Sequence, residues 1–182
     1  MSARSIDRAE EVAMGMQSVS QLDEREIRTT FGSFPTGVTA LCTQGPSGPD
    51  GMAASAFTGV SLEPPLVSVC VQKSSTTWPR LRSRHKLGVS ILASGQEAAC
   101  RSLSARSGDR FVNLAWTASE TGAVFLNGAV AWLDCRMHAE LDAGDHVIVL
   151  LEIERLETTA DTAPLVFHRS RFRSLLEPER AA

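Results

Sequence analysis

The sequence predicts a mainly β (α+β) domain, an antiparallel barrel with short helices packed outside it. About six segments have the alternation or the dense apolar composition of β-strands. Turn-forming residues connect most of them, and the helical patterns are few and short, so the chain does not read as a strand–helix–strand array. A length of 182 residues fits one domain with a core of its own.

The N-terminal part predicts a helix before the first strand. Ser20 begins a capping-box-like segment, and Leu22, Ile27 and Phe31 share roughly one helical face up to Gly32. Three ranges follow from this: a mobile lead-in over 1–19, the folded domain over 20–176 and a C-terminal tail over 177–182.

Strand signals begin at Thr36, where the apolar period changes to two. The turn-rich segment GPSGPDG at 45–51 predicts a hairpin between its flanking strands. The further expected strands are 66–72, 87–92, 129–140, 146–156 and 164–168. Two short helices are expected, one from Trp78-Pro79 and one from a capping box at Ser94 to about Ser104.

Composition argues against a nucleic-acid partner. The chain has 18 Lys and Arg against 21 Asp and Glu, a net charge of −3, and it contains no tyrosine, seven Phe and three Trp. Such a chain offers neither a basic surface nor many aromatic platforms for bases.

Two features indicate a cytoplasmic protein. No apolar run approaches the roughly 20 residues of a membrane helix, and charges interrupt the N-terminus where a signal peptide would be apolar. The cysteines, Cys42, Cys70, Cys100 and Cys135, form no C-x-x-C pair, so we expect plain thiols packed as small hydrophobic side chains, with no disulfide and no zinc.

Several nucleotide and catalytic motifs are missing. The sequence lacks G-x-G-x-x-G after a strand, a G-K-[ST] loop, H-E-x-x-H and G-x-S-x-G. A nucleotide bound to this protein would have to be held by a different arrangement of residues.

The segment 51–77 is the first candidate site. Small residues and the hydroxyls of Ser55, Thr58 and Ser61 precede a strand, and Lys73 with four hydroxyl residues follows it. Small side chains let a flat ligand approach the backbone, and a lysine beside hydroxyls suits a phosphate. The alternative is a small-residue barrel turn followed by a Ser/Thr-rich helix start.

His146, after a Gly-Asp turn at a strand start, is the second candidate, because histidine can donate, accept or titrate near neutral pH. The alternative is a rim histidine bonded to its neighbour. His138, Glu140 and Asp142 share one strand face with Asp145 and His146 nearby, but no ligand spacing indicates a metal, so a solvated strand face is expected.

The basic run at 80–86 could meet nucleic acid or dinucleotide phosphates, but a solvated helix face fits the net charge better.

Four segments in order carry a family resemblance: FPTGVTAL (34–41), GMAASAFTGVSLEPPLVSVCV (51–71), AGDHVIVLLEI (143–153) and PLVFHRSRF (164–172). With these motifs, residues 22–175 resemble the flavin reductase family, the short-chain NAD(P)H:flavin oxidoreductases that serve two-component flavin-dependent monooxygenases.

The resemblance implies an FMN-binding split β-barrel of antiparallel Greek-key type, with flavin held between the barrel and the partner subunit of a homodimer. It implies reduction of FAD or FMN by NADH or NADPH, and delivery of reduced flavin to a separate monooxygenase. The alternative is a non-catalytic flavin- or haem-binding split-barrel protein. No nucleic acid, membrane or metal partner is expected.

The resemblance also assigns residues. The residues assigned to flavin binding are Thr36, Ala53, Ala54, Ser55, Ala56, Ser61, Lys73, Ser74 and Ser75. Of these, Ser61, Lys73, Ser74 and Ser75 are expected at the phosphate. The nicotinamide is bordered by Pro35, Thr36, Gly37, His146 and Phe172. Hydride transfer needs positioning rather than an acid or base, so His146 is expected to act by placing the nicotinamide. The family's frequent T-A-N-S is here Ala53-Ala54-Ser55-Ala56, so backbone amides would make more of the flavin contacts.

Overall fold

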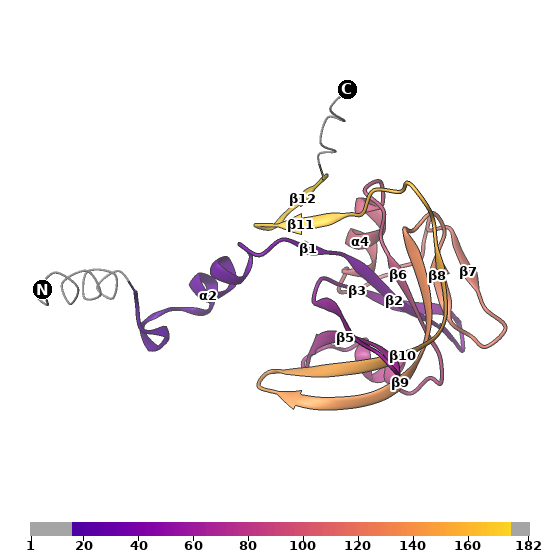
Figure 1. Ribbon diagram of the computed structural model, residues 1–182, viewed down its shortest axis with the longest axis horizontal. Helices are drawn as coiled ribbons and strands as arrows, with labels where there is room; N and C mark the ends of the chain where they lie inside the picture. The colour runs from indigo at the N-terminus through magenta and orange to yellow at the C-terminus, as the bar shows by residue number, and fades with distance from the viewer. Residues whose placement is uncertain (1–15, 176–182) are drawn as a thin grey trace, which may run out of the picture. The chain divides into compact units, whose positions relative to one another are not determined.

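The computed structural model describes residues 16–175, and its largest element is an antiparallel sheet with the order β3-β2-β6-β9-β10-β5-β4 (Figure 1). Its strands are β2 (Thr39–Gly45), β3 (Gly48–Ala54), β4 (Phe57–Leu62), β5 (Pro65–Gln72), β6 (Leu87–Ile91), β9 (Ala131–Ala143) and β10 (His146–Thr158). The edge strands β3 and β4 are not hydrogen-bonded to each other, but β3 also contacts β5. The sheet is therefore curled without closing, which confirms a mainly β, split-barrel-like fold.

Two smaller sheets accompany it. One contains β1 (Thr36–Gly37), β11 (Val166–His168) and β12 (Arg171–Arg173), with β11 in the middle. The other is a hairpin of β7 (Trp116–Ala118) and β8 (Val124–Leu126). Gly88 of β6 lies directly against the backbone of Val124, so β8 approaches the large sheet more closely than a side chain would allow.

The core has two parts because β2 is buried on both faces. Leu41 points into one apolar cluster, while Ala40 and Cys42 point into the other. The first cluster contains Leu41, Val67, Val69, Val71, Trp78, Leu81, Leu87, Val89, Leu133, Cys135, Val149 and Leu151. The second contains Val38, Ala40, Cys42, Leu92, Ala99, Leu103, Phe111, Val124, Leu126 and Leu165.

Two short helices cover these clusters. α3 (Trp78–Arg82) buries Trp78 and Leu81, with proline in its first turn as expected. α4 (Glu97–Leu103) buries Ala99 and Leu103 in the second cluster.

The expected capping box at Ser94 is wrong. The residue at the N-cap of α4 is Gln96, which makes no side-chain cap hydrogen bond. Its Oε1 instead accepts from the backbone N–H of Ala93 (2.9 Å), and its Nε2 donates to the carbonyl of Asn127 (2.9 Å). The Gln96 side chain therefore joins the start of α4 to neighbouring loops instead of capping the helix.

The chain divides into two compact units, residues 1–34 and 35–182. The first contains a 3₁₀ turn, η1 (Val19–Gln21), and α2 (Glu24–Phe31). The expected start at Ser20 is wrong, because Asp23 caps α2: its carboxylate accepts from Glu26 N–H, and the Glu26 carboxylate accepts from Asp23 N–H, both at 2.8 Å. The predicted tail and most of the predicted lead-in lie outside the described residues.

The predicted strands are found, with three differences. The strand expected from Thr36 is divided at Val38 between β1 and β2, which belong to different sheets. The hairpin around 45–51 is tighter than expected, because β3 already starts at Gly48. Four strands were not predicted, namely β4, β7, β8 and β12. They are short, or rich in small and polar residues.

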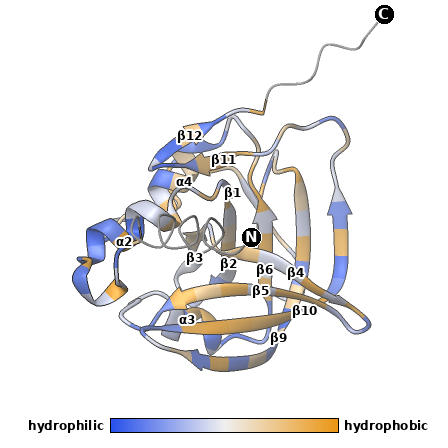
Figure 2. Ribbon diagram, turned by 60° about the vertical axis from the view of Figure 1, so that its left-hand side comes forward, coloured by the Kyte–Doolittle hydropathy of each residue, from blue (hydrophilic) through white to orange (hydrophobic). Residues whose placement is uncertain are grey.

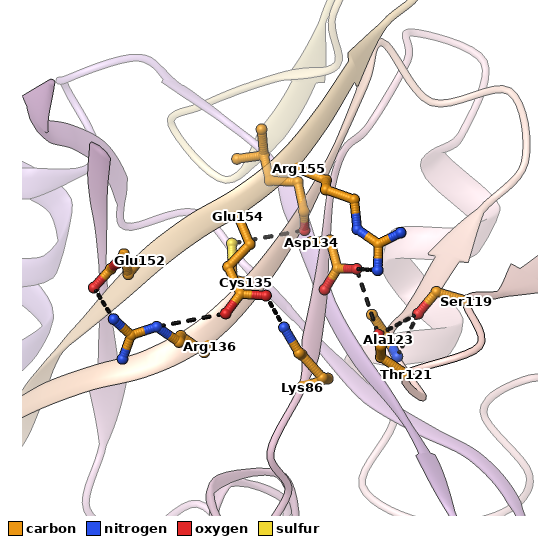
Figure 3. Close-up of polar contacts among 11 residues, drawn as sticks. Lys86, Ser119, Thr121, Ala123, Asp134, Cys135, Arg136, Glu152, Glu154 and Arg155 are labelled. Atoms are coloured by element: carbon orange, nitrogen blue, oxygen red, sulfur yellow. Dashed lines mark hydrogen bonds and ion pairs between the residues drawn. The ribbon is translucent and has the colours of Figure 1, made fainter. Parts of the chain in front are cut away.

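Charged side chains link β9 and β10 to the start of β6 (Figure 3). Arg136 pairs with Glu152 (2.6 Å) and with Glu154 (3.5 Å), and Lys86 pairs with Glu154. His138 adds a contact to Glu152 at 3.1 Å. Opposite charges thus alternate along this surface. Among the described residues, no helix is long and apolar enough to cross a bilayer.

Candidate functional site

A cavity of about 350 Å³ lies among the end of β3, α4 and the β11–β12 hairpin. Its lining residues are Val38, Ala53, Ala54, Ser55, Cys100, Arg101, Ser104, Phe167, Ser170 and Phe172. We call it the ring cavity, because its walls are mostly small or aromatic. Such walls suit a flat ligand that packs against the backbone of β3.

Local structure explains these walls. Cys100 and Arg101 of α4 lie on the same side as Ser104, the residue that caps the C-terminus of the helix, since residues three and four apart are neighbours. Phe172 folds back edge-on against Phe167, with ring centroids 5.4 Å apart and an interplanar angle of 60°. The turn between them holds Arg169 and Ser170 in the left-handed region, at φ 49° and 59°.

Cys100 contributes a neutral wall. Partial burial raises the pKa of the Cys100 thiol. The hydrogen bond with Ser104 and the charge of Arg101 lower this pKa, but by less, so the pKa stays above its ordinary value. The thiol is therefore protonated at neutral pH.

A second cavity, of about 510 Å³, adjoins the first, because Ala53 and Ser104 line both. It is lined by Met52, Ala53, Gln72, Ser74, Ser75, Thr76, Thr77, Leu103, Ser104, Ala105, Arg106 and Arg110. We call it the phosphate cavity, because two arginines and several hydroxyl residues line it. Guanidinium and hydroxyl donors together form a site for a phosphate oxyanion.

The two arginines differ in how they are held. Arg110 Nη1 donates to the carbonyl of Gly51 (3.0 Å) and to Thr77 Oγ1 (2.5 Å), which fixes its guanidinium. Arg106 is exposed, and in the described part of the chain it makes no ion pair with a carboxylate. Ser75 Oγ accepts from the N–H of Trp78 (3.1 Å), so this hydroxyl already helps to start α3.

A third cavity, of about 230 Å³, continues from the phosphate cavity, with Thr76, Arg106 and Arg110 lining both. Its polar wall includes Asp50, whose carboxylate accepts two hydrogen bonds from Arg80, at 2.6 and 2.9 Å. Burial pushes the pKa of Asp50 up, but Arg80, the N–H of Gly51 and the charge of Arg110 together hold it below its ordinary value. Asp50 is therefore ionised at neutral pH.

Several of the predicted site residues lie at these cavities. Ala53, Ala54, Ser55 and Phe172 line the ring cavity, and Ala53 also lines the phosphate cavity with Ser74 and Ser75.

The segment that begins at Pro35 runs beside the ring cavity. Thr36 pairs with Phe167 in the β1–β11 register, Gly37 pairs with Val166, and Val38 lines the cavity itself.

Seven predicted residues line neither cavity, namely Pro35, Thr36, Gly37, Ala56, Ser61, Lys73 and His146. Ser61 Oγ bonds to the backbone of Glu63 at 3.2 Å, in the β4–β5 turn.

Lys73 and His146 lie together at the end of β5. Lys73 pairs with Asp142 (3.0 Å), and its N–H donates to the carbonyl of Asp145. His146 Nδ1 lies 2.8 Å from Asp145 Oδ1, and His146 pairs across the sheet with Gln72, which lines the phosphate cavity.

The acidic and histidine residues considered for a metal are divided among other partners. Glu140 accepts from Trp78 Nε1 (2.6 Å) and pairs with Arg82, while His138 contacts Glu152. Over residues 16–175, no three His, Cys, Asp or Glu side chains gather as a metal would need. The basic run is likewise paired, through Arg80, Arg82 and Lys86.

The cysteines are all free, and the expectation of buried thiols holds for two. Cys42 and Cys135 are buried, and burial raises the pKa of Cys135 to about 12. For Cys70 the expectation is wrong: it lies on the outer face of β5 and is exposed.

Sequence reasoning missed Arg101, Arg106 and Arg110, and it missed Phe167. A signal existed for two of these residues, because the loop SARSGDR at 104–110 combines two arginines with serine and a glycine. Gly108 there has φ 89°, which lets the loop turn so that Arg106 and Arg110 line the same cavity.

Comparison with known proteins agrees with this architecture. The model of the flavin reductase like domain matches residues 31–176. A flavin reductase from Pseudomonas putida is 36% identical over 151 residues, covering 82% of this chain and 89% of that protein. An NADH-dependent FAD reductase from Streptomyces globisporus is 39% identical over 167 residues, covering 89% of this chain and 91% of that protein.

Solved structures give the same result. The NADH:FAD oxidoreductase of Streptomyces globisporus, in complex with NAD and FAD fragments, has a TM-score of 0.83 and 38% identity, and the match covers 91% of this chain and all of that chain. The flavin reductase component of a bacterial two-component tryptophan halogenase has a TM-score of 0.79 and 36% identity, over 86% of this chain and 100% of that one. The chain belongs to the flavin reductase-like domain family.

Proposed function

We propose that this chain is an NADH:flavin oxidoreductase that reduces FAD and supplies the reduced flavin to a separate monooxygenase. The observation that carries the proposal is the pair of joined cavities, one with small and aromatic walls and the other with arginines and hydroxyls. Relatives with these activities, including a reductase subunit of a flavin-dependent monooxygenase from Rhodococcus jostii at 33% identity, support it.

The cavities fit a flavin in both shape and charge. Ala53, Ala54 and Ser55 have small side chains, so a flat ring system could pack against the strand and bond to backbone groups. Arg106 and Arg110 would hold the phosphate with Ser74, one cavity further along. The protein thus holds the two ends of the flavin by different chemistry.

In this mechanism the protein contributes the relative position of the two reacting groups. A bound flavin supplies N5 as the hydride acceptor, opposite C4 of the reduced nicotinamide. The chain must hold these atoms about 3–3.5 Å apart, and no protein acid or base is required for the transfer. Phe167 and Phe172 form an apolar wall that keeps water from one side of the ring cavity.

His146 keeps its predicted role within this proposal. Asp145 Oδ1 lies 2.8 Å from His146 Nδ1 and so orients the imidazole, leaving Nε2 for a ligand. We propose that His146 and Lys73 meet the substrates from the edge of the phosphate cavity, beside Gln72.

The third cavity favours FAD over FMN. It extends past Arg106 and Arg110 and adds Arg80 and Asp50 to a polar wall, which could receive the second phosphate and the adenosine of a dinucleotide. FMN and riboflavin would leave this cavity to water.

The proposal includes a homodimer. Val67, Val69 and Val71 face the core, so the alternate residues of β5 face outward. Cys70 there pairs with Ile148 of β10, which also pairs with Leu141 of β9. β5 and the first half of β10, residues 147–151, are hydrophobic (Figure 2), and Leu141 is 52% exposed. An apolar sheet face of this kind supports contact with a second copy.

A cytoplasmic location is also proposed, supported by the four free cysteines.

One assay tests the activity. The protein is mixed with NADH and with FAD, FMN or riboflavin, and the loss of the reduced-nicotinamide absorbance is followed. We expect flavin-dependent oxidation, with the lowest KM for FAD. Oxidation no faster than in the absence of protein, with NADH and with NADPH, would refute the proposal. In that case a tightly held flavin or haem in the purified protein would identify the non-catalytic alternative.

Arg106→Gln tests the phosphate cavity. Removing one charged hydrogen-bonding partner should raise the KM for FAD about tenfold, since such a bond is worth roughly 1.5–3 kcal/mol, and it should leave riboflavin unaffected. Arg82→Gln is the matched control, because Arg82 is exposed and lines none of the three cavities. An equal change for FAD and riboflavin would show that Arg106 does not hold a phosphate.

A further inference from the structure

Arg101 is the only charged side chain that lines the ring cavity in the described part of the chain. The other lining residues are small, hydroxylic or apolar. A guanidinium at the rim of such a cavity can bind an anionic part of a ligand, which apolar packing against a ring system does not do.

The contacts of Arg101 leave its donors available. Its guanidinium carbon lies 4.9 Å from the centroid of the Phe172 ring, a cation–π arrangement. Its one carboxylate contact in residues 16–175 is Glu97, one helical turn away at 3.9 Å, which is too long for a hydrogen bond. The Arg101 side chain is 70% exposed. The guanidinium therefore rests on an aromatic face, and within residues 16–175 its N–H groups make no hydrogen bond to a carboxylate.

The flavin does not explain this charge. The phosphate end of the flavin is provided for by Arg106 and Arg110, in the other cavity. The remaining anion of the proposed reaction is the diphosphate of the reduced nicotinamide dinucleotide, and Arg101 lies against Phe172, the residue predicted to border the nicotinamide. A planar guanidinium binds a diphosphate through paired N–H donors.

We propose that Arg101 binds the diphosphate of the nicotinamide dinucleotide and thereby selects reductants that carry it. This inference rests on the proposed function. The guanidinium rests on Phe172 in the free protein and turns to the diphosphate when the dinucleotide arrives. Arg101 acts on binding of the reductant, so its loss should change KM rather than kcat.

The test uses two reductants on the full chain. NADH carries the diphosphate, whereas 1-benzyl-1,4-dihydronicotinamide carries the same reacting ring and no phosphate. Arg101→Gln should raise the KM for NADH roughly ten- to a hundredfold, the loss expected for a charged hydrogen bond, with kcat within about twofold. The rate with the benzyl compound should stay unchanged. Arg101→Lys should retain part of the NADH affinity, and Arg82→Gln should behave as the wild type with both reductants.

A binding measurement adds a readout independent of turnover. ADP-ribose contains the diphosphate and lacks the nicotinamide, so calorimetric titration should show its affinity falling in Arg101→Gln by about the same factor as the KM for NADH rises. Added salt should weaken ADP-ribose binding to the wild type more than to Arg101→Gln.

The outcomes separate this inference from the proposed function. If Arg101→Gln slows both reductants equally, Arg101 serves the flavin or the shape of the cavity and the inference is wrong. If neither reductant is affected, Arg101 takes no part in binding and the inference is also wrong. If the wild type oxidises neither reductant with FAD, the proposed function itself fails.

Discussion

Gly88 shows how a single residue sets the distance between two sheets. A Cβ built at Gly88 would lie 2.1 Å from the carbonyl oxygen of Val124 and 2.7 Å from its carbonyl carbon. These are backbone atoms, which cannot turn away as a side chain can. Gly88→Ala should therefore destabilise the protein by about 3 kcal/mol, measured by urea unfolding. Gly95→Ala is the control, because a Cβ there has no neighbour within 4 Å. Equal stability of the two variants would contradict the close approach of β8.

Asp50 gives the fold a defined response to acid. The pKa of Asp50 lies below its ordinary value, despite the burial that raises it, because Arg80 bonds to the charged form. A depressed pKa in the folded state means that the stabilisation is fully present above the unfolded-state pKa and is lost as the pH falls through the folded-state pKa. Asp50→Asn should therefore lower stability at pH 6.

The same variant should differ less from the wild type as the pH drops below about 4, near the ordinary carboxyl range. Unfolding midpoints in urea, measured from pH 6 to pH 3, would show the two curves converging. A stability difference that stays constant down to pH 3 would mean that Asp50 is not held by its charge.

At the level of elements, α4 links the core to the site. One face of α4 buries Leu103 in the second cluster, while Cys100, Arg101 and Ser104 line the ring cavity. Leu103→Ala should cost about 2–5 kcal/mol, as truncation of a buried leucine does. Since Leu103 also lines the phosphate cavity, the KM for FAD should rise several-fold.

Leu126→Ala provides the matched comparison for this element. Leu126 is as deeply buried in the same cluster but lines neither the ring nor the phosphate cavity. Stability should fall by a similar amount, with the KM for FAD unchanged when both proteins are assayed well below their melting temperatures. An equal rise of KM in both variants would indicate general loosening rather than a role for α4.

The elements that could be predicted are those whose signal is local. β5, β6 and β10 are dense apolar runs, and the β2–β3 hairpin carries its own turn residues. The helix cap was misplaced because Ser20 and Asp23 both precede the helix, and only Asp23 has a glutamate at the position that completes the box. β4 was missed because its side chains are mixed and its place depends on pairing with β5.

The site was predictable where one segment carries it and not where distant segments meet. Ala53, Ala54 and Ser55 lie within one quoted motif and line the ring cavity. Arg106 joins Ser74 only because the loop after α4 folds over the end of β5, a contact that the spacing of the sequence does not indicate. The family resemblance predicted the function, whereas the arginines of the site could be identified only from the folded structure.

At the scale of the whole molecule, the apolar outer face of β5, β10 and β9 carries the last prediction. We expect the protein to be a dimer in solution, with Leu141 within the contact. Leu141→Asp places a charge beside Ile148 on this face, and burying an unpaired carboxylate there would cost several kcal/mol, roughly a hundredfold or more in dimer affinity. Size-exclusion chromatography with light scattering should show the variant as a monomer with unchanged strand content by circular dichroism.

If the second copy completes the flavin site, as the family resemblance implies, the KM for FAD should rise in parallel. Val112→Asp is the control, since Val112 is 57% exposed in the loop between α4 and β7 and belongs to none of these three strands, and it should remain dimeric and active. A wild type that is monomeric at micromolar concentration and fully active would show that one copy of the chain is sufficient for the reaction.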